Sequence, residues 1–185
     1  FLVARTLGWP FSLFGTQGVC MAFLVLVPLL PLLTAFIVMT GDRAEQDQNA
    51  RAGLLPIVAS FLGAQLTLVL VTSGGPVTIQ LYDPAAIANL AFPIGFYVDR
   101  LSAVMMVLIT GVTTLIYRYS MGYMYQDRGY RRYLGMLGLT TSVLLCMVSS
   151  ANLVMLFIFW QILSWLLFLL AHNHGHAATL SGAAN

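Results

Sequence analysis

Residues 19–40 read VCMAFLVLVPLLPLLTAFIVMT, a run of 22 residues without a charge. A helix rises about 1.5 Å per residue, so a helix over this run would cross the roughly 30 Å hydrocarbon core of a bilayer. Pro28 and Pro31 lie inside the run, and each removes a backbone N–H donor, which predicts a kinked helix. The stretch therefore indicates an integral membrane protein.

The composition of the whole chain agrees with a membrane location. Of its 185 residues, 59% are hydrophobic and 8% are charged, whereas soluble domains carry roughly 25% charged residues. Cys20 and Cys146 both lie in apolar stretches, so we interpret them as packing residues rather than a disulfide framework. The chain begins at Phe1 and stops in a run of small residues, which we interpret as a fragment of a longer protein.

Further apolar runs predict the rest of the fold. We expect five transmembrane helices, over residues 19–40, 53–73, 101–117, 133–149 and 153–171. Between the second and third helices, the alternation of apolar and polar residues in Val77–Tyr82 predicts a strand, and Ile94–Val98 is its candidate partner. The predicted fold class is an all-α integral membrane protein with a short extracytoplasmic β-hairpin.

Arginine positions predict the orientation of these helices, since the chain has no lysine. With five crossings, loops 41–52 and 118–132 and the tail 172–185 share one side. Six of the eight arginines fall on that side: Arg43, Arg51, Arg118, Arg128, Arg131 and Arg132. The positive-inside rule then places the tail in the cytoplasm, and the segment 1–18 and the hairpin outside.

Several function classes are not supported by the sequence. No phosphate-binding loop, Cys-pair metal motif or nucleophile elbow occurs. The arginines follow membrane topology rather than a basic face, so nucleic-acid binding is not expected. Nothing in the chain would bind NADH, flavin or an iron–sulfur cluster, so we expect no catalytic centre and no cofactor, with the lipid bilayer as the first partner.

A group of tyrosines lies close to the arginines of the predicted loop 118–132. Its members are Tyr119, Tyr123, Tyr125, Tyr130 and Tyr133. Amphipathic rings at this position are typical of an aromatic belt at headgroup depth. A loop that docks a protein partner is the alternative interpretation.

Gln161 is the most informative single position, because it lies in the middle of the fifth predicted helix. Polar groups at that depth usually face the protein interior. In a helix, His172 lies about 20° and Ser164 about 60° around the axis from Gln161. We therefore expect a polar seam of three ion-pathway candidates: Gln161, Ser164 and His172. Interhelical hydrogen bonding without an ion path is the alternative.

Two further histidines follow the fifth predicted helix, and His174 and His176 are weaker pathway candidates. His172 and His176 would share a helix face and could bind a metal. Gly175 and the lack of an accompanying carboxylate or cysteine instead favour a hydrated cap of the helix C-terminus, so no metal site is predicted. Histidine titrates near neutrality, which leaves a proton-handling role open.

Four short motifs occur in order along the chain: Val98-Asp99-Arg100-Leu101-Ser102, Thr110-Gly111-Val112, Tyr119-Ser120-Met121-Gly122-Tyr123-Met124 and Ser150-Ala151-Asn152-Leu153. These motifs resemble the antiporter-like membrane subunits of respiratory complex I, chain 5 in particular, and their relatives in multisubunit sodium/proton antiporters. The resemblance extends over about residues 96–170. It implies that this chain is the N-terminal part of a helical membrane subunit with many more spans.

The fifth predicted helix departs from the family's pattern. Members carry a Trp–Glu pair there, and the glutamate is thought to take part in proton transfer. The matching positions here are Trp160 and Gln161, and glutamine cannot exchange a proton. The segment 160–165, followed by His172-Asn173-His174, resembles the membrane subunit of the bacterial two-component inorganic-carbon pump (the DabB type). The resemblance implies a large zinc-containing cytoplasmic partner and coupling of an ion gradient to carbon dioxide hydration.

These observations lead to three functional hypotheses. The first is an energy-coupling subunit of a hetero-oligomeric complex in the bacterial inner membrane, which conducts protons or sodium to power inorganic-carbon (CO2/bicarbonate) uptake. The second is a proton-translocating subunit of NADH-quinone oxidoreductase, against which Gln161 counts because a carboxylate is expected there. The third is a non-conducting membrane scaffold.

Overall fold

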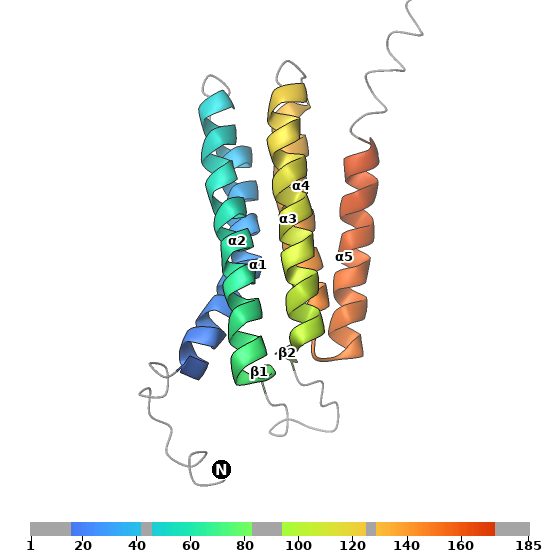
Figure 1. The fold of residues 1–185 in the computed structure, drawn as a ribbon. Coiled ribbons are helices and arrows are strands. Elements are labelled where there is room, and N and C mark those ends of the chain that lie inside the picture. The colour runs from blue at the N-terminus through green and yellow to red at the C-terminus, as the bar shows by residue number, and fades with distance from the viewer. Residues whose placement is uncertain (1–15, 42–45, 83–93, 125–128, 173–185) are drawn as a thin grey trace, which may run out of the picture.

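The fold is taken from a computed structural model, in which residues 16–41, 46–82, 94–124 and 129–172 are described. Figure 1 shows long helices that run side by side, with a small sheet at one end of the bundle. In chain order the elements are α1 (Thr16–Thr40), α2 (Gln46–Gly74), β1 (Val77–Tyr82), β2 (Ile94–Val98), α3 (Arg100–Tyr123), α4 (Tyr130–Val148) and α5 (Leu153–His172).

The five helices and the hairpin confirm the predicted fold class, a helical integral membrane protein. Three helices are long and apolar enough to cross a membrane by length and composition: Gln48–Gly74, Arg100–Tyr123 and Leu153–Ala171. The described apolar part of α1, Leu26–Thr40, is shorter. α4 lies among these helices and carries Arg131 and Arg132 in its first turn.

The helix ends differ most from the expected ones in two places. α2 begins at Gln46 rather than at residue 53, and α3 continues through Arg118 to Tyr123 rather than ending at residue 117. The predicted loops 41–52 and 118–132 are therefore too long. Hydropathy reports where a helix leaves the apolar layer, whereas the helix itself ends where its backbone hydrogen bonds stop.

The hairpin strands have the bounds predicted from the alternating pattern. β1 and β2 pair antiparallel, with Val77 opposite Val98 and a bulge between Gln80 and Tyr82. β2 also holds the short connection between α4 and α5. The Tyr97 N–H donates to the carbonyl of Ser149 at 2.8 Å, and the Ala151 N–H donates to the carbonyl of Gly95 at 3.1 Å.

Helices α1–α4 form a closed four-helix bundle. α1 packs against α2 and α4, and α3 packs against the same two helices. α5 packs mainly against α4 and lies at the edge of the bundle (Figure 1). Two clusters of buried side chains fill the bundle, one around Met106 and Leu145 and the other around Tyr117 and Tyr130.

Two backbone carbonyls in the proline-containing part of α1 accept hydrogen bonds from other helices. Pro31 has no N–H, so the carbonyl of Val27, four residues earlier, lacks its intrahelical donor. The buried hydroxyl of Ser60 in α2 donates to this carbonyl at 2.8 Å. The Ser142 hydroxyl of α4 donates to the carbonyl of Pro28 at 2.6 Å. The proline-containing part of α1 is thus bonded to both of its neighbours.

Further hydroxyl hydrogen bonds join the remaining pairs of helices. Thr34 of α1 donates to the carbonyl of Gly53 in α2 at 2.9 Å. The phenol of Tyr117 in α3 donates to the carbonyl of Ala50 in α2 at 3.0 Å. Between α3 and α4, the hydroxyls of Thr113 and Thr141 form a hydrogen bond at 3.1 Å. Each neighbouring pair in the four-helix bundle therefore shares at least one hydrogen bond.

An arginine at the start of one helix caps the end of another at both ends of the bundle. The guanidinium of Arg131 in α4 donates to the carbonyl oxygens at the end of α1, those of Val38, Met39 and Gly41. Arg100 at the start of α3 donates to the carbonyl of Thr72 near the end of α2 at 3.5 Å. A cation is favourable there because it meets the negative end of the helix dipole.

Asp99 caps the start of α3. The N–H of Ser102 donates to the Asp99 carboxylate at 2.7 Å. This hydrogen bond from Ser102 holds the pKa of Asp99 below its ordinary value.

The Ser60 hydrogen bond leads to a first prediction. Ser60→Ala should lower the free energy of unfolding of the full-length protein by about 1 kcal/mol, because the Val27 carbonyl loses its donor. Reversible unfolding in mixed detergent micelles measures the change. The matched control is Ser73→Ala, since the exposed Ser73 hydroxyl donates within its own helix, to the carbonyls of Val69 and Leu70.

A double-mutant cycle tests the cause of this effect. In a Pro31→Ala background, residue 31 regains an N–H for the Val27 carbonyl, so the cost of Ser60→Ala should fall toward zero. Equal costs of Ser60→Ala in both backgrounds would show that the proline does not create the need for the serine.

A second prediction concerns the close approach of α4 to α1. A Cβ at Gly138 would lie 2.8 Å from the carbonyl oxygen of Pro31 and 3.2 Å from the backbone nitrogen of Ala35. Gly138→Ala should therefore cost about 1–3 kcal/mol of unfolding free energy. Gly122→Ala is the control, because nothing lies within 4 Å of its added Cβ and the change should be neutral or stabilising. Equal stability of the two variants would contradict the observed packing.

Candidate functional site

The buried polar groups of the bundle are hydroxyls. Among the residues whose side chains the structure describes, no buried side chain is acidic, basic or a histidine, and the buried polar residues are threonines and serines, apart from the tyrosines. Most of these hydroxyls donate to a backbone carbonyl, as Thr67, Thr110 and Thr140 do within their own helices. The described interior of α1–α4 thus holds helices together and contains no group that stores a proton near neutral pH.

α5 presents an apolar stripe to the bundle. Its half-buried side chains recur every three or four residues, at Met155, Phe159, Leu163 and Leu166. Because α5 packs mainly against α4, this stripe faces α4. None of the residues in the apolar 18-residue window of α5 is buried within this chain.

The first two candidates of the polar seam lie on the other side of α5. Gln161 is two residues from both Phe159 and Leu163, or about 200° around the helix, and is exposed. Ser164 is exposed too, and its hydroxyl donates to the carbonyl of Trp160 at 3.0 Å. The Gln161 amide has no hydrogen-bond partner among the residues that the structure describes.

The remaining candidates are less fully placed. His172 is the last residue of α5, on the expected side of the helix by spacing, but its side chain lies outside the described part of the structure. His174 and His176 lie wholly outside the described residues. The structure therefore brings Gln161 and Ser164 to one exposed side of α5, while a role for the histidines stays a prediction.

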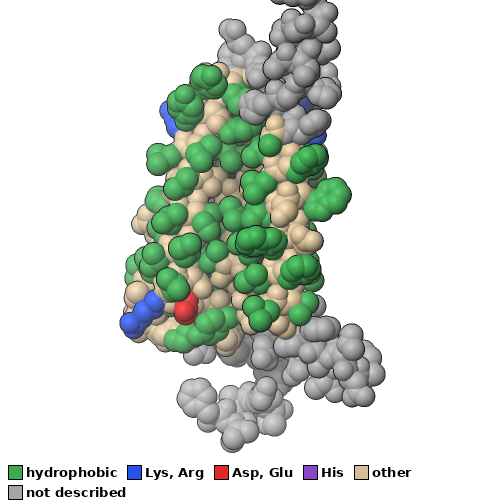
Figure 2. Space-filling model, turned by 90° about the vertical axis from the view of Figure 1, so that its right-hand side faces the viewer, with side chains coloured by type: hydrophobic (Ala, Val, Ile, Leu, Met, Phe, Trp, Pro, Cys, Tyr) green, Lys and Arg blue, Asp and Glu red, His purple; other side chains and the backbone are tan. Residues whose placement is uncertain are grey.

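Figure 2 views the molecule from the side on which α5 lies. Hydrophobic side chains cover the middle of this face, and the charged side chains in view lie toward its two ends. Large exposed side chains on α5 include Phe157, Trp165 and Phe168. This distribution suits a surface surrounded by lipid or by other membrane helices.

The tyrosine group separates into two kinds of position. Tyr119 and Tyr123 are 69% and 77% exposed, as an aromatic belt requires. Tyr130 is fully buried, so its assignment to the belt is wrong, and Tyr125 lies outside the described residues. Tyr117 is fully buried as well, and its position one residue before Arg118 gave no sign of this burial.

Comparisons with known proteins agree with this architecture. Residues 85–134 match the family described as NADH-Ubiquinone oxidoreductase (complex I), chain 5 N-terminus. Over 152 residues the chain is 35% identical to NAD(P)H-quinone oxidoreductase subunit 5, chloroplastic, of Zygnema circumcarinatum. This alignment covers 78% of this chain and 22% of that protein. The chain is 34% identical to NAD(P)H-quinone oxidoreductase chain 5 of Synechocystis sp., in an alignment that covers 78% of this chain and 22% of that protein.

The name of a third relative states a different function. Over 154 residues the chain is 33% identical to the probable inorganic carbon transporter subunit DabB1 of Halothiobacillus neapolitanus, which covers 80% of this chain and 26% of that protein. The chain thus spans about a quarter or less of the length of these relatives.

Proposed function

The chain belongs to the antiporter-like membrane subunit family of complex I, and on that premise we propose that it forms part of an ion-translocating, energy-coupling subunit. The relatives are named as subunits, so we further propose that it works with other proteins in a hetero-oligomeric membrane complex. The observation that carries the proposal is the Gln161 amide, exposed in the middle of an apolar helix.

The position of Gln161 argues for a covering of protein or water over this side of α5. An unpaired polar group in hydrocarbon costs several kcal/mol. Gln161 lies about eight residues from the start of α5, too deep for its short side chain to reach the headgroups. A buried amide has four hydrogen-bond sites to satisfy, which a neighbouring helix or a chain of water molecules would do.

Chemistry limits what Gln161 itself does in such a path. An amide has no accessible pKa, so it can orient water but cannot store a proton. The titrating group must come from another position, and His172 is the nearest candidate on α5. Ser164 completes this side as a weaker polar group, because its hydroxyl already donates to Trp160.

The narrower proposal is that the complex powers inorganic-carbon uptake together with a large zinc-containing cytoplasmic protein. Its supports are the name of the Halothiobacillus relative and the glutamine in place of the expected glutamate in α5. The runner-up is a proton-translocating subunit of an NAD(P)H-quinone oxidoreductase, which is favoured by the names of the algal and cyanobacterial relatives.

We also propose an orientation for the chain in the bacterial inner membrane. The segments 41–52 and 118–132 hold six arginines, which favours the cytoplasmic side for them. The hairpin of β1 and β2, at the opposite end of the bundle, would then face outward. α1 would enter the membrane from the outside.

The third prediction tests the role of Gln161. In the full-length protein, Gln161→Leu should lower ion-coupled function or the yield of the assembled complex by about tenfold, because leucine removes the only amide on this side of the described part of α5. Gln161→Glu should be tolerated, since members of the family carry glutamate there. Ion-driven uptake and complex yield are the two measurements.

Phe157→Leu is the matched control, because Phe157 is one turn away on the same exposed side and the change stays apolar. It should leave both measurements unchanged. If Gln161→Leu behaves like this control, Gln161 is an ordinary surface position and the proposed path along α5 is wrong.

The fourth prediction tests the orientation. A reporter fused after Gly41 should be active in the cytoplasm, and one fused after Gly75 should be active outside, because α2 separates the two positions. Paired alkaline phosphatase and fluorescent protein fusions give opposite signals for the two sides. The reverse pattern would refute the orientation, while equal signals would refute α2 as a span.

A further inference from the structure

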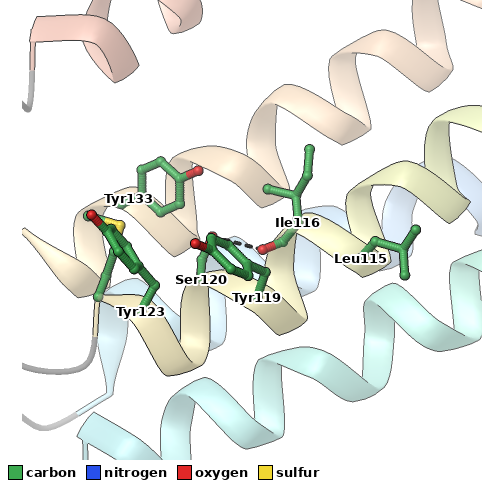
Figure 3. Close-up of a pocket in the computed structure, with 7 residues that line it drawn as sticks. Leu115, Ile116, Tyr119, Ser120, Tyr123 and Tyr133 are labelled. Atoms are coloured by element: carbon green, nitrogen blue, oxygen red, sulfur yellow. Dashed lines mark hydrogen bonds between the residues drawn. The ribbon is translucent and has the colours of Figure 1, made fainter.

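An open groove lies between the C-terminal half of α3 and the start of α4, with a volume of about 430 Å³. Figure 3 shows its principal side chains: Leu115, Ile116, Tyr119, Ser120, Tyr123 and Tyr133. All but Tyr133 come from α3. The groove lies at the end of the bundle opposite the hairpin, where α3 ends and α4 begins.

The walls of the groove are aromatic. The rings of Tyr119 and Tyr123, one helical turn apart, stack with centroids 5.7 Å apart and planes 15° from parallel. Tyr133 of α4 lies across from them (Figure 3). Ser120 donates its hydroxyl to the carbonyl of Ile116 at 2.8 Å, so the side chain between the walls offers no spare donor. The polar groups offered to a ligand are the phenols of Tyr119 and Tyr123.

The character of the groove changes along α3. Leu115 and Ile116, at 72% and 40% exposed, make its inner part apolar. Tyr119 and Tyr123 follow one and two turns later, or about 6 and 12 Å along the helix axis, and carry the hydroxyls. Toward the membrane surface, the lining of the groove thus changes from apolar side chains to tyrosine phenols. This order suits a phospholipid, because its apolar acyl chain would lie against the former and its phosphate against the latter.

The charge around this end of the bundle is positive. Arg118 and Arg132 are exposed and adjoin Tyr119 and Tyr133 in the sequence. Segments 41–52 and 118–132 together hold six arginines and four acidic residues. Among the described arginines of this end, Arg131 is occupied at the end of α1, whereas Arg118 and Arg132 are exposed to solvent or lipid headgroups without lining the groove itself.

We propose that this groove binds an anionic phospholipid of the surrounding bilayer. One acyl chain lies against Leu115 and Ile116, the phosphate and glycerol oxygens accept hydrogen bonds from the phenols of Tyr119 and Tyr123, and the nearby arginines favour a negative headgroup. A soluble protein partner fits less well, because the inner half of the groove lies on the apolar part of α3.

Photocrosslinking on the full-length subunit in its complex tests the proposal. The complex is placed in bilayer discs that contain a photoactivatable phosphatidylglycerol or the matching phosphatidylcholine, and labelled peptides are identified by mass spectrometry. Phosphatidylglycerol should label peptides of 115–124 and 133 about fivefold or more above phosphatidylcholine. The outward-facing residues Leu55 and Leu62 of α2 should be labelled equally by both and serve as the internal reference.

Two sets of variants locate the contacts. Tyr119→Leu with Tyr123→Leu keeps the groove apolar and should lower its phosphatidylglycerol labelling about tenfold. Removing each arginine, by Arg118→Gln or Arg132→Gln, should lower it about fivefold. The matched control is Tyr97→Leu in β2, at the opposite end of the bundle, which should leave labelling of the groove unchanged.

Two results would overturn the proposal. Equal labelling by both lipids, unaffected by the tyrosine variants, would mean that the groove meets only bulk lipid. No labelling of the groove by either lipid, while α2 is labelled in the same sample, would mean that protein covers it. Labelling of α2 in each variant also shows that the variant remains folded in the disc.

Discussion

The carbonyl oxygen of Val27 shows the constraint on which this bundle depends: in hydrocarbon, a backbone group that loses its helical partner must find another within the protein. Pro31 removes the donor, and the Ser60 hydroxyl from α2 replaces it at 2.8 Å. Side-chain hydroxyls also form a hydrogen bond between each neighbouring pair of α1–α4, to a carbonyl in three pairs and to another hydroxyl between α3 and α4. Apolar contacts alone do not distinguish helix neighbours from lipid, whereas these hydrogen bonds specify which helices adjoin and at what height.

This use of hydroxyls separates the structural part of the chain from the candidate functional part. Within α1–α4 the described serines and threonines are largely committed to carbonyls, which suits a rigid scaffold. The exposed amide of Gln161 is on α5, outside the ring of cross-helix hydrogen bonds. The Gln161 amide, which has no described hydrogen-bond partner, therefore lies on the side of α5 that faces away from the bundle, and the scaffold positions that side.

The fold was largely predictable because membrane helices are specified by long uncharged runs and hairpin strands by alternation. Helix ends were not, because α2 and α3 continue into polar sequence. The burial of Tyr117 depends on a residue far away in the chain: a Cβ at Gly53 would lie 2.5 Å from its hydroxyl. A local pattern of tyrosines beside arginines contains no information about that space. The depth of Gln161 was evident from its helix, but no pattern in α5 shows what lies against its exposed side.

The way α5 is attached explains why a single amide can matter there. At its start, α5 is held through the hydrogen bonds between β2 and residues 149–151. Along its length it meets α4 through the apolar stripe of Met155, Phe159 and Leu163. Apolar contact is non-directional, so it specifies the rotation of a helix less strictly than hydrogen bonds do. One polar group in an otherwise apolar helix face favours the arrangement that satisfies it, as a buried asparagine selects the register of a coiled coil. Under the proposed covering of this side by protein or water, Gln161 would orient α5 in the same way.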